Sequence, residues 1–348
     1  MEITVTAEAT KTHLIGTIAA EDIEQAAFYV FKDDQKIHQR WYTKDLKIDF
    51  PHEGKRGTYK LKGFVRNNGV VKSKVSTSVF VYGDSVAIND LIQKPIEQGP
   101  YLVNAEGQDF HCLYSPSTES RLFVMLTGAV NREKIPLPIF NRWTWRNKLP
   151  GHVLCISDPT LQADESLGIG WHLGSANVDV TEKLSQLVLK LSGALGIPSN
   201  RIVTYGSSAG GFSAMMLAAK LEGATAVAIN PQTNVLNYHP RHVRHMMSIC
   251  FPGVDRSQAM IDYDARLNAI DHLPGKPMRL VIAQNTLDKH HWEDHYPQLA
   301  IALGLPNVTG ASTDNKHWSI IYHDIGGHGP ETPEVFSQII DRIKINMP

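Results

Sequence analysis

Cysteine and long apolar runs are scarce in this chain, and each scarcity excludes a class of protein. The three cysteines, Cys112, Cys155 and Cys250, are widely spaced and odd in number. They predict no disulfide framework and indicate a reducing compartment. No apolar run reaches the length of about 18 residues that a membrane-spanning helix needs. The N-terminus lacks a basic segment followed by an apolar one, so we expect no secretory signal and a cytoplasmic location.

A charge imbalance is missing as well. The chain has 34 basic and 35 acidic residues, a formal net charge of −1, which gives no overall attraction to nucleic acid or to an anionic membrane. We therefore expect no nucleic-acid partner and no membrane span. Apolar residues make up 42% and charged residues 20% of the chain, a composition that supports a globular core and argues against disorder.

Residues 1–84 alternate apolar and polar positions over short runs, which predicts strands with one buried face. The clearest runs are 2–6, 27–31, 46–50, 59–65 and 75–81. Short strands at this spacing predict a small antiparallel β-sandwich of immunoglobulin-like type. Trp41 and Tyr59 are its candidate core aromatic residues, and a connector is expected over 85–107.

From about residue 108 the pattern changes to continuous apolar runs that alternate with helical stretches. This alternation is typical of an α/β domain with a mostly parallel sheet, and we assign it to 108–348. The apolar runs are 122–126, 153–156, 202–205, 226–229, 280–283 and 319–322. The predicted helices are 180–195, 211–221, 296–303 and 333–345.

The most informative motif joins one of these strands to the helix that follows it. Residues 206–210 read Gly-Ser-Ser-Ala-Gly, a G-x-S-x-G motif whose strand-turn-helix context indicates a nucleophile elbow. Ser208 would stand on a strained turn with its hydroxyl above the sheet, and the two glycines would let both backbones approach closely. A phosphate-binding loop is excluded, because no Lys-Ser or Lys-Thr pair follows the glycines.

A serine nucleophile needs a base to take its proton and an acid to orient that base. With an elbow of this type the acid and then the base should follow later strands. Asp288 follows the run at 280–283 and is the candidate acid, although it could instead cap a helix. Glu293 and Asp294 lie nearby and stay open as substitutes.

The candidate base follows the last predicted strand. His328 lies in a Gly-Gly-His-Gly loop after 319–322, from which its ring could reach back to Ser208. His323 also lies at this strand end, but the glycine-rich setting favours His328.

An oxyanion hole would need two backbone N–H groups near the serine. Ala209, the residue after the nucleophile, would supply one, and the loop after 122–126 would supply the other. Gly128 and Ala129 in that loop are small enough to pass close to a substrate carbonyl. An ordinary turn is the alternative interpretation of these two residues.

Two segments could shape a substrate site. Trp171 lies in a loop after a predicted strand, where it could either stack on a sugar ring or fill the loop's own small core. Arg241 and Arg244 lie in a basic segment, and they could bind an anionic substrate or form a solvated helix face. Three histidines are interleaved with these arginines at a spacing that suggests metal ligands, namely His239, His242 and His245. We expect no metal there, because the arginines repel a cation and no carboxylate is adjacent.

The elbow, the acid and the Gly327-His328-Gly329 loop occur in an order that resembles the α/β-hydrolase superfamily over 108–348. The sandwich pattern, with Asp158-Pro159-Thr160 and Gly170-Trp171, also resembles proteins of bacterial capsule and surface-polysaccharide loci. It is similar, more distantly, to the acetyltransferase component of accessory secretion systems. These resemblances imply a cytoplasmic enzyme that acts on acyl groups of a glycan. The His-Gly-Gly-Gly motif of many lipases is absent, which argues against a lipase of that type.

The sequence therefore predicts a serine esterase or deacylase that acts on acyl groups of a carbohydrate. A polysaccharide O-acetyltransferase with the same residues is the first alternative, and a non-catalytic glycan-binding or scaffold protein is the second. An esterase would need no cofactor, whereas a transferase would use acetyl-CoA or another acyl donor. A carbohydrate or small acyl ester is the expected substrate. Self-association or association with a glycosyltransferase is also consistent with the resemblance.

Overall fold

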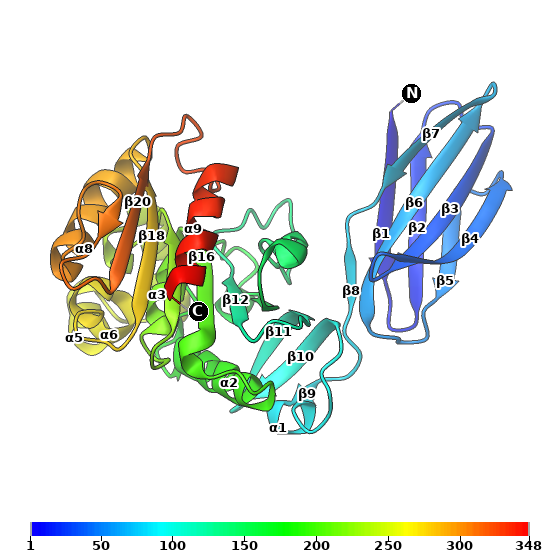
Figure 1. Cartoon of the computed structure of the whole chain (residues 1–348). Coiled ribbons are helices and arrows are strands. Elements are labelled where there is room, and N and C mark those ends of the chain that lie inside the picture. The colour runs from blue at the N-terminus through cyan, green and yellow to red at the C-terminus, as the bar shows by residue number, and fades with distance from the viewer. Residues whose placement is uncertain (1, 347–348) are drawn as a thin grey trace. The chain divides into compact units, whose positions relative to one another are not determined.

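The computed structural model describes residues 2–346 of the chain. It divides into two compact units, shown in Figure 1: Met1–Val86 with Glu97–Leu102, and Ala87–Ile96 with Val103–Pro348. The segment 85–107, expected to be a connector, is instead largely structured. It contains β9 (Val86–Ala87), α1 (Ile88–Leu91) and β10 (Gly99–Ala105). Both strands belong to the large sheet described below, so this stretch is part of the folded architecture.

The smaller unit consists of two antiparallel sheets, ordered β1-β2-β5 and β4-β3-β6-β7, with β8 paired to β6. Its strands are β1 (Ile3–Ala9), β2 (His13–Ala20), β3 (Gln25–Lys32), β4 (Gln35–Thr43), β5 (Lys47–Pro51), β6 (Gly57–Asn67), β7 (Val70–Val75) and β8 (Val79–Val81). The strand expected over 75–81 is divided between the end of β7 and β8. Asn68 and Gly69, with φ of 48° and 76°, form the tight turn between β6 and β7, as hairpin twist requires.

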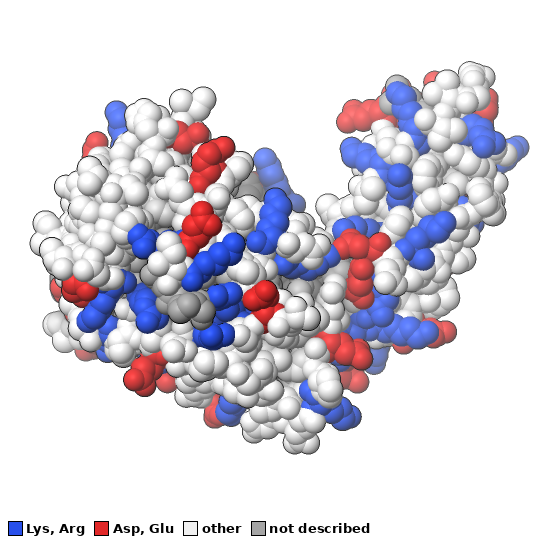
Figure 2. All heavy atoms as spheres, in the orientation of Figure 1, with Lys and Arg blue, Asp and Glu red and all other residues white. Residues whose placement is uncertain are grey.

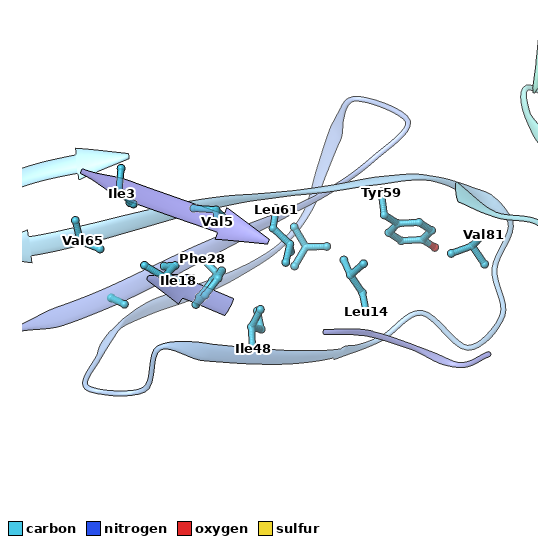
Figure 3. Packing of buried hydrophobic residues seen from close by; sticks show 12 residues of the cluster. Ile3, Val5, Leu14, Ile18, Phe28, Ile48, Tyr59, Leu61, Val65 and Val81 are labelled. Carbon is cyan, nitrogen blue, oxygen red and sulfur yellow. The ribbon is translucent and has the colours of Figure 1, made fainter. Parts of the chain in front are cut away.

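The sandwich core is apolar, and along strands such as β1 and β2 its side chains alternate with outward-facing residues. Figure 3 shows this cluster, in which Leu14, Phe28 and Leu61 are fully buried. Tyr59 is 1% exposed, which confirms its predicted core position. Its hydroxyl donates to the Lys55 carbonyl at 2.9 Å, the tyrosine-corner contact found in immunoglobulin-like sandwiches.

Trp41 is 68% exposed, so its predicted core position is wrong. It lies on β4, at the edge of its sheet, where one face of the strand has little to pack against. The period-two pattern predicts that a strand has two faces, but it does not indicate which strand lies at the edge.

The larger unit is built on a mostly parallel sheet in the order β19-β20-β18-β17-β16-β12-β13-β11-β10-β9. The strands not yet given are β11 (Gln108–Ser115), β12 (Leu122–Leu126), β13 (His152–Ile156), β16 (Ile202–Ser207), β17 (Thr225–Ile229), β18 (Arg279–Asn285), β19 (Gly310–Ala311) and β20 (His317–Tyr322). Strands β13, β12, β16, β17, β18 and β20 run parallel, whereas β11 and β19 pair antiparallel. A separate small hairpin pairs β14 (Gly174–Ser175) with β15 (Val178–Asp179). Each predicted apolar run lies in a strand.

Helices connect these strands and bury apolar faces against them. They are α2 (Val180–Ala194), α3 (Ala209–Ala218), α4 (Pro240–Cys250), α5 (Arg256–Asp262), α6 (Asp264–Leu267), α7 (Ala269–His272), α8 (Tyr296–Leu303) and α9 (Pro333–Asn346). Helix α3 packs against β12, β16 and β17, and α9 packs against β18 and β20. Helix α2 begins where the Asp179 carboxylate accepts from the Glu182 N–H, and it buries Leu184, Leu187, Val188 and Leu191. The predicted fold class, an α/β unit with an N-terminal β-sandwich, is confirmed.

The surface and the cysteines agree with the composition. Figure 2 shows Lys and Arg interspersed with Asp and Glu on the face in view. The three cysteines are buried and unpaired. Within residues 2–346, no helix combines the length and the apolar character that crossing a membrane requires.

Candidate active site

The predicted site residues follow the carboxyl ends of neighbouring parallel strands. Strands β16, β17 and β18 are aligned so that Ser207 lies opposite Ile229, and Ile229 lies opposite Ala283. The loops after these strands therefore meet at one edge of the sheet, where ligands bind in open α/β folds. Ser208, Asp288 and His328 each lie just beyond such a strand end.

Ser208 occupies the turn between β16 and α3 with φ 55° and ψ −123°. A non-glycine residue in this conformation costs about 1–3 kcal/mol and persists only where its surroundings impose it. Here the Ser208 N–H donates to the Ile229 carbonyl at 2.9 Å, and its carbonyl accepts from the Phe212 N–H at 3.1 Å. The backbone of the predicted nucleophile is thus strained and held from both sides.

The two glycines of the motif are required by close backbone contact. A Cβ on Gly206 would lie 2.1 Å from the Gly210 carbonyl oxygen, and a Cβ on Gly210 would lie 2.7 Å from the Leu126 carbonyl oxygen. Real Cβ atoms do not approach that closely, so no side chain fits at either position. The elbow consequently packs directly against the loop after β12.

Asp288 binds two histidines at once. Its Oδ2 lies 2.5 Å from His328 Nδ1, and its Oδ1 lies 3.0 Å from His291 Nδ1. The two imidazole rings stack, with centroids 4.2 Å apart and planes inclined by 15°. His291 and Asp288 are buried, whereas the His328 side chain is 41% exposed. The structure thus brings together the predicted acid and base, and adds a second imidazole.

The alternatives considered for acid and base lie elsewhere. Asp294 accepts from His290 Nδ1 at 2.8 Å rather than contacting the glycine-rich loop. His323 Nδ1 lies 2.8 Å from the Thr286 hydroxyl. Of the two histidines after β20, His328 is therefore the one that meets Asp288.

Among the described residues, the Ser208 hydroxyl forms a side-chain hydrogen bond with a glutamine and none with an imidazole. Gln232 Nε2 donates to Ser208 Oγ at 2.9 Å and lies 2.7 Å from His291 Nε2. Catalytic hydrogen bonds to a nucleophile often shorten only when substrate is bound. A single side chain, that of Gln232, therefore links Ser208 to the cluster of Asp288, His291 and His328.

Trp171 is not a surface for stacking a sugar. Its side chain is fully buried, and its indole N–H donates to Gln232 Oε1 at 3.2 Å. Trp171 and His172 both have positive φ, 51° and 54°. Full burial contradicts the interpretation that Trp171 stacks on a sugar ring. Its contact with Gln232 lies outside its own loop, so its surroundings are wider than the small loop core that was the alternative.

The residues predicted to form the oxyanion hole lie beside Ser208. Ala209 is the first residue of α3, where backbone N–H groups have no partner within the helix. A Cβ on Gly128 would lie 3.0 Å from the Ser207 carbonyl oxygen, so this loop passes against the elbow. Ala129 is exposed and directly follows Gly128.

Burial and hydrogen bonding shift the pKa values of Asp288 and His291 in opposite directions. Burial raises the pKa of Asp288, but hydrogen bonds from His291 and His328 outweigh burial and hold that pKa below its ordinary value. Burial lowers the pKa of His291, and this outweighs the hydrogen bond with Asp288 that raises it. The site therefore favours an ionised carboxylate beside a neutral His291.

A carboxylate and two imidazoles are also ligand types for transition metals. The relevant atoms of Asp288, His291 and His328 lie within 4.8 Å of one another. Both Nδ1 atoms already bind Asp288 oxygens, so ligation through them would break these hydrogen bonds. The two Asp288 oxygens and the two Nδ1 atoms therefore satisfy one another by hydrogen bonding.

One hollow adjoins the cluster through His328, and a second hollow is lined by other residues. The first, of about 310 Å³, is lined by Asn141, Arg142, Trp145, Ser207, Asn230, His328, Gly329 and Pro330. The second is a groove of about 1270 Å³ beside the loop after β12. Arg241, Arg244, His242 and His245 from α4 line this groove with Arg132, Glu133 and Glu165.

Gln232 and His291 were not predicted from the sequence. Gln232 lies three residues beyond the end of β17, and His291 lies three residues after Asp288. The position of Gln232 after a parallel strand was the available signal. His291 begins a π-helical turn, His291–His295, a feature that often marks functional sites but has no sequence signature here.

Comparison with known proteins gives structural relatives only. No family model matches the chain, and no curated protein matches its sequence. The Glycosylation Associate Protein complex of Streptococcus agalactiae is similar over 98% of this chain, with TM-score 0.54 and 15% identity. This chain spans 62% of that protein's length.

Two hydrolases are also similar over nearly the whole chain. Prolyl oligopeptidase B of Galerina marginata has TM-score 0.51 and 13% identity over 99% of this chain and 44% of its own. A puromycin hydrolase has TM-score 0.52 and 12% identity over 98% of this chain and 46% of its own. At this level of identity the similarity shows the fold, which is of α/β-hydrolase type with an N-terminal β domain.

Proposed function

We propose that this protein is a serine-dependent ester enzyme that acts on acyl groups of a carbohydrate. Ser208 is the nucleophile, His328 the general base and Asp288 the residue that orients the base. The observation that carries this proposal is the Asp288–His328 pair, at 2.5 Å, beside a serine held at φ 55° on a strand-to-helix turn. A strained, buried serine next to an oriented imidazole is the arrangement that nucleophilic acyl transfer needs.

The reaction follows from these positions. Ser208 Oγ attacks the acyl carbonyl carbon while its proton passes to His328 Nε2, and a tetrahedral oxyanion forms. The C–O bond to the leaving alcohol then breaks, and His328 returns the proton to that oxygen. Water then attacks the carbonyl carbon of the acyl-Ser208 and gives a proton to His328. The bond between that carbon and Ser208 Oγ breaks, and His328 returns the proton to Oγ, which releases the acid and restores Ser208.

Backbone groups stabilise the oxyanion in this proposal. The N–H of Ala209 lies at the N-terminal end of α3, where the helix dipole favours negative charge. The N–H of Ala129, in the loop that Gly128 brings against the elbow, is the second donor. Losing one such donor typically costs about 3–4 kcal/mol of transition-state stabilisation.

The carbohydrate lies in the hollow beside His328 in this proposal. Trp145 offers an aromatic surface, and Asn141 offers an amide among the lining residues. Aromatic rings with a few polar groups are typical of pockets for polar organic ligands. Arg241 and Arg244, on the wall of the larger groove, would bind an anionic part of the substrate or donor.

Transfer to a sugar hydroxyl is the second candidate, because it shares every step up to the acyl-enzyme. It would require acetyl-CoA or another acyl donor and a site that excludes water from the second step. The similarity to a glycosylation-associated complex favours testing this outcome, and it also makes a protein partner a candidate.

Turnover of p-nitrophenyl acetate by wild type and Ser208→Ala tests the proposal. We expect the variant to fall by roughly 10⁴–10⁶-fold, to the background rate. Ser192→Ala is the matched control, since Ser192 is a buried serine of α2 whose hydroxyl donates to the Leu189 carbonyl. Circular dichroism would verify that both variants keep the fold. Retained turnover in Ser208→Ala would show that the elbow is not the nucleophile.

Adding a candidate glycan acceptor separates the two reactions. A transferase should release its acyl group faster with acceptor and produce acetylated glycan, whereas an esterase should release it to water regardless. A wild type that neither turns over the ester nor reacts with a fluorophosphonate would support a non-catalytic glycan-binding or scaffold role instead.

A further inference from the structure

We propose that Gln232 and His291 are positioning residues that direct the Ser208 hydroxyl toward His328. They do so through a chain of hydrogen bonds in which each donor and each acceptor is fixed. The chain runs from Trp171 through Gln232 to both Ser208 and His291, and from His291 to Asp288. This inference rests on the proposed function, because it assigns a role to residues around the same serine. It adds a second connection between Asp288 and Ser208 that does not pass through His328.

The indole of Trp171 fixes the orientation of the Gln232 amide. An indole N–H is only a donor, so the atom it meets at 3.2 Å must be the amide oxygen. The NH₂ group of Gln232 then faces Ser208 Oγ at 2.9 Å and His291 Nε2 at 2.7 Å. Its two hydrogens match these two acceptors, so every polar group of this fully buried amide is satisfied.

The same amide fixes the tautomer of His291. Because Gln232 donates to Nε2, that nitrogen carries no proton, and a neutral imidazole must then carry its proton on Nδ1. Nδ1 lies 3.0 Å from Asp288 Oδ1, which is the acceptor such a proton requires. His291 is 2% exposed, so water does not compete for either nitrogen.

The consequence for Ser208 concerns the direction of its own proton. A hydroxyl that accepts from Gln232 has its hydrogen free to point elsewhere. Asp288 holds His328 with Nδ1 toward the carboxylate, which leaves Nε2 as the group that can take that hydrogen. Gln232 and His328 would thus both bond the Ser208 hydroxyl, the first as donor and the second as acceptor.

Packing makes the chain rigid enough for this role. Trp171, Gln232 and His291 are each at most 2% exposed. The His291 ring also stacks on His328, so both imidazoles are held by Asp288 and by each other. Displacing a reactive group by about 1 Å can cost on the order of 100-fold in rate, and this buried chain opposes such a displacement.

The first test is independent of activity. We would label the full chain with ¹⁵N-histidine and assign the His291 ring signals from their loss in His291→Gln. At neutral pH we expect His291 to be protonated on Nδ1 and unprotonated on Nε2, and we expect the Nε2 resonance to shift in Gln232→Leu. A proton on Nε2, or signals unchanged by Gln232→Leu, would overturn the proposed chain.

The second test measures the reactivity of Ser208 through its rate of labelling by a fluorophosphonate. We expect Gln232→Leu to slow labelling by about 100-fold, with a lower kcat and a nearly unchanged KM for p-nitrophenyl acetate. Trp171→Phe, which keeps an aromatic ring but removes the N–H, should give a smaller loss in the same direction. Gln284→Leu is the matched control, because Gln284 is a buried glutamine that bonds the Asn285 carbonyl.

The two tests separate this inference from the proposed function. A wild type with the expected His291 tautomer that is never labelled would support the hydrogen-bonded chain and overturn the serine-enzyme proposal alone. A wild type that is labelled, with Gln232→Leu reacting as fast as Gln284→Leu, would keep the enzyme and overturn the positioning role. If Gln232→Leu fails to fold, Trp171→Phe and the wild-type tautomer still decide the question.

Discussion

The two units of the chain bury different kinds of side chain. The sandwich interior is an apolar cluster that includes Leu14, Phe28 and Leu61. The α/β unit also has a large apolar core, but at the ends of β16, β17 and β18 it buries Ser208, Gln232, Asp288 and other polar residues. A buried polar group costs free energy unless it is hydrogen bonded, so these residues make a specific network rather than a general core.

This difference distinguishes the unit that contains the candidate site. In the sandwich, the described contacts explain stability by packing and by the Tyr59 corner. In the α/β unit, backbone strain at Ser208 opposes stability, whereas hydrogen bonds from His291 and His328 hold the Asp288 carboxylate in its ionised form. Features that oppose stability and are held in place by their surroundings are typical of functional sites.

The largest expected effect comes from removing the carboxylate of Asp288, the acid of the polar network in the α/β unit. Asp288→Asn keeps the side-chain shape but replaces one carboxylate oxygen with a donor, so it cannot accept from both His291 and His328. We expect kcat for p-nitrophenyl acetate to fall by roughly 10⁴-fold, as for an equivalent change in a serine protease triad. Asp294→Asn, which affects an exposed pair with His290, should change kcat little. A loss below about tenfold in Asp288→Asn would contradict the acid role.

The next comparison is between a buried ion pair of the α/β unit and a surface ion pair of the sandwich. Arg142 and Glu331 form a buried pair with Nη2–Oε2 2.6 Å, and Tyr205 also donates to Glu331. Arg142→Ala would leave a buried carboxylate without its partner, so we expect the free energy of unfolding of the α/β unit to fall by about 3–5 kcal/mol. Lys60→Ala removes a surface pair with Asp34 in the sandwich and should cost about 1 kcal/mol or less. Urea unfolding of both variants tests this, and equal losses would contradict it.

Within the sandwich, a buried position and an exposed position should differ in how much a truncated side chain lowers stability. Leu61 is fully buried, so Leu61→Ala should lower the free energy of unfolding of this unit by about 2–5 kcal/mol. Trp41 is 68% exposed, and Trp41→Ala should stay within about 0.5 kcal/mol of wild type. Thermal unfolding followed by calorimetry measures both changes. The rate of Ser208 labelling below the transition should be unaffected, and a large change would show that the sandwich contributes to the site.

The last prediction is a pH dependence of stability that arises from His295. Burial, with smaller contributions from His291 and His290, lowers the pKa of His295 from 6.5 to about 3. The unfolded chain then binds more protons than the folded one between these values, so stability is complete above pH 6.5 and falls as the pH drops toward 3. One pH unit below the ordinary value should cost about 1 kcal/mol. Urea unfolding across this range should show a shallower dependence in His295→Gln, and parallel curves would contradict the assignment.

Much of the architecture could be predicted from local pattern. Period-two alternation predicted the sandwich strands, and continuous apolar runs predicted strands such as 122–126, which match β12 residue for residue. The elbow was predictable because its glycines are demanded by backbone contact at the positions the motif gives them. The order of Ser208, Asp288 and His328 along the chain also predicted that these three lie near one another.

The sequence by itself determined the two kinds of unit, the elbow and the strand ends where the acid and base lie, because these depend on neighbours in the chain. Only the tertiary structure decided that Trp171 is buried, that Trp41 is exposed and that Gln232 and His291 join the cluster. Those outcomes depend on which strands lie side by side and on which donors meet which acceptors. The residues involved are up to 61 positions apart, as for Trp171 and Gln232, and no local periodicity encodes such a meeting.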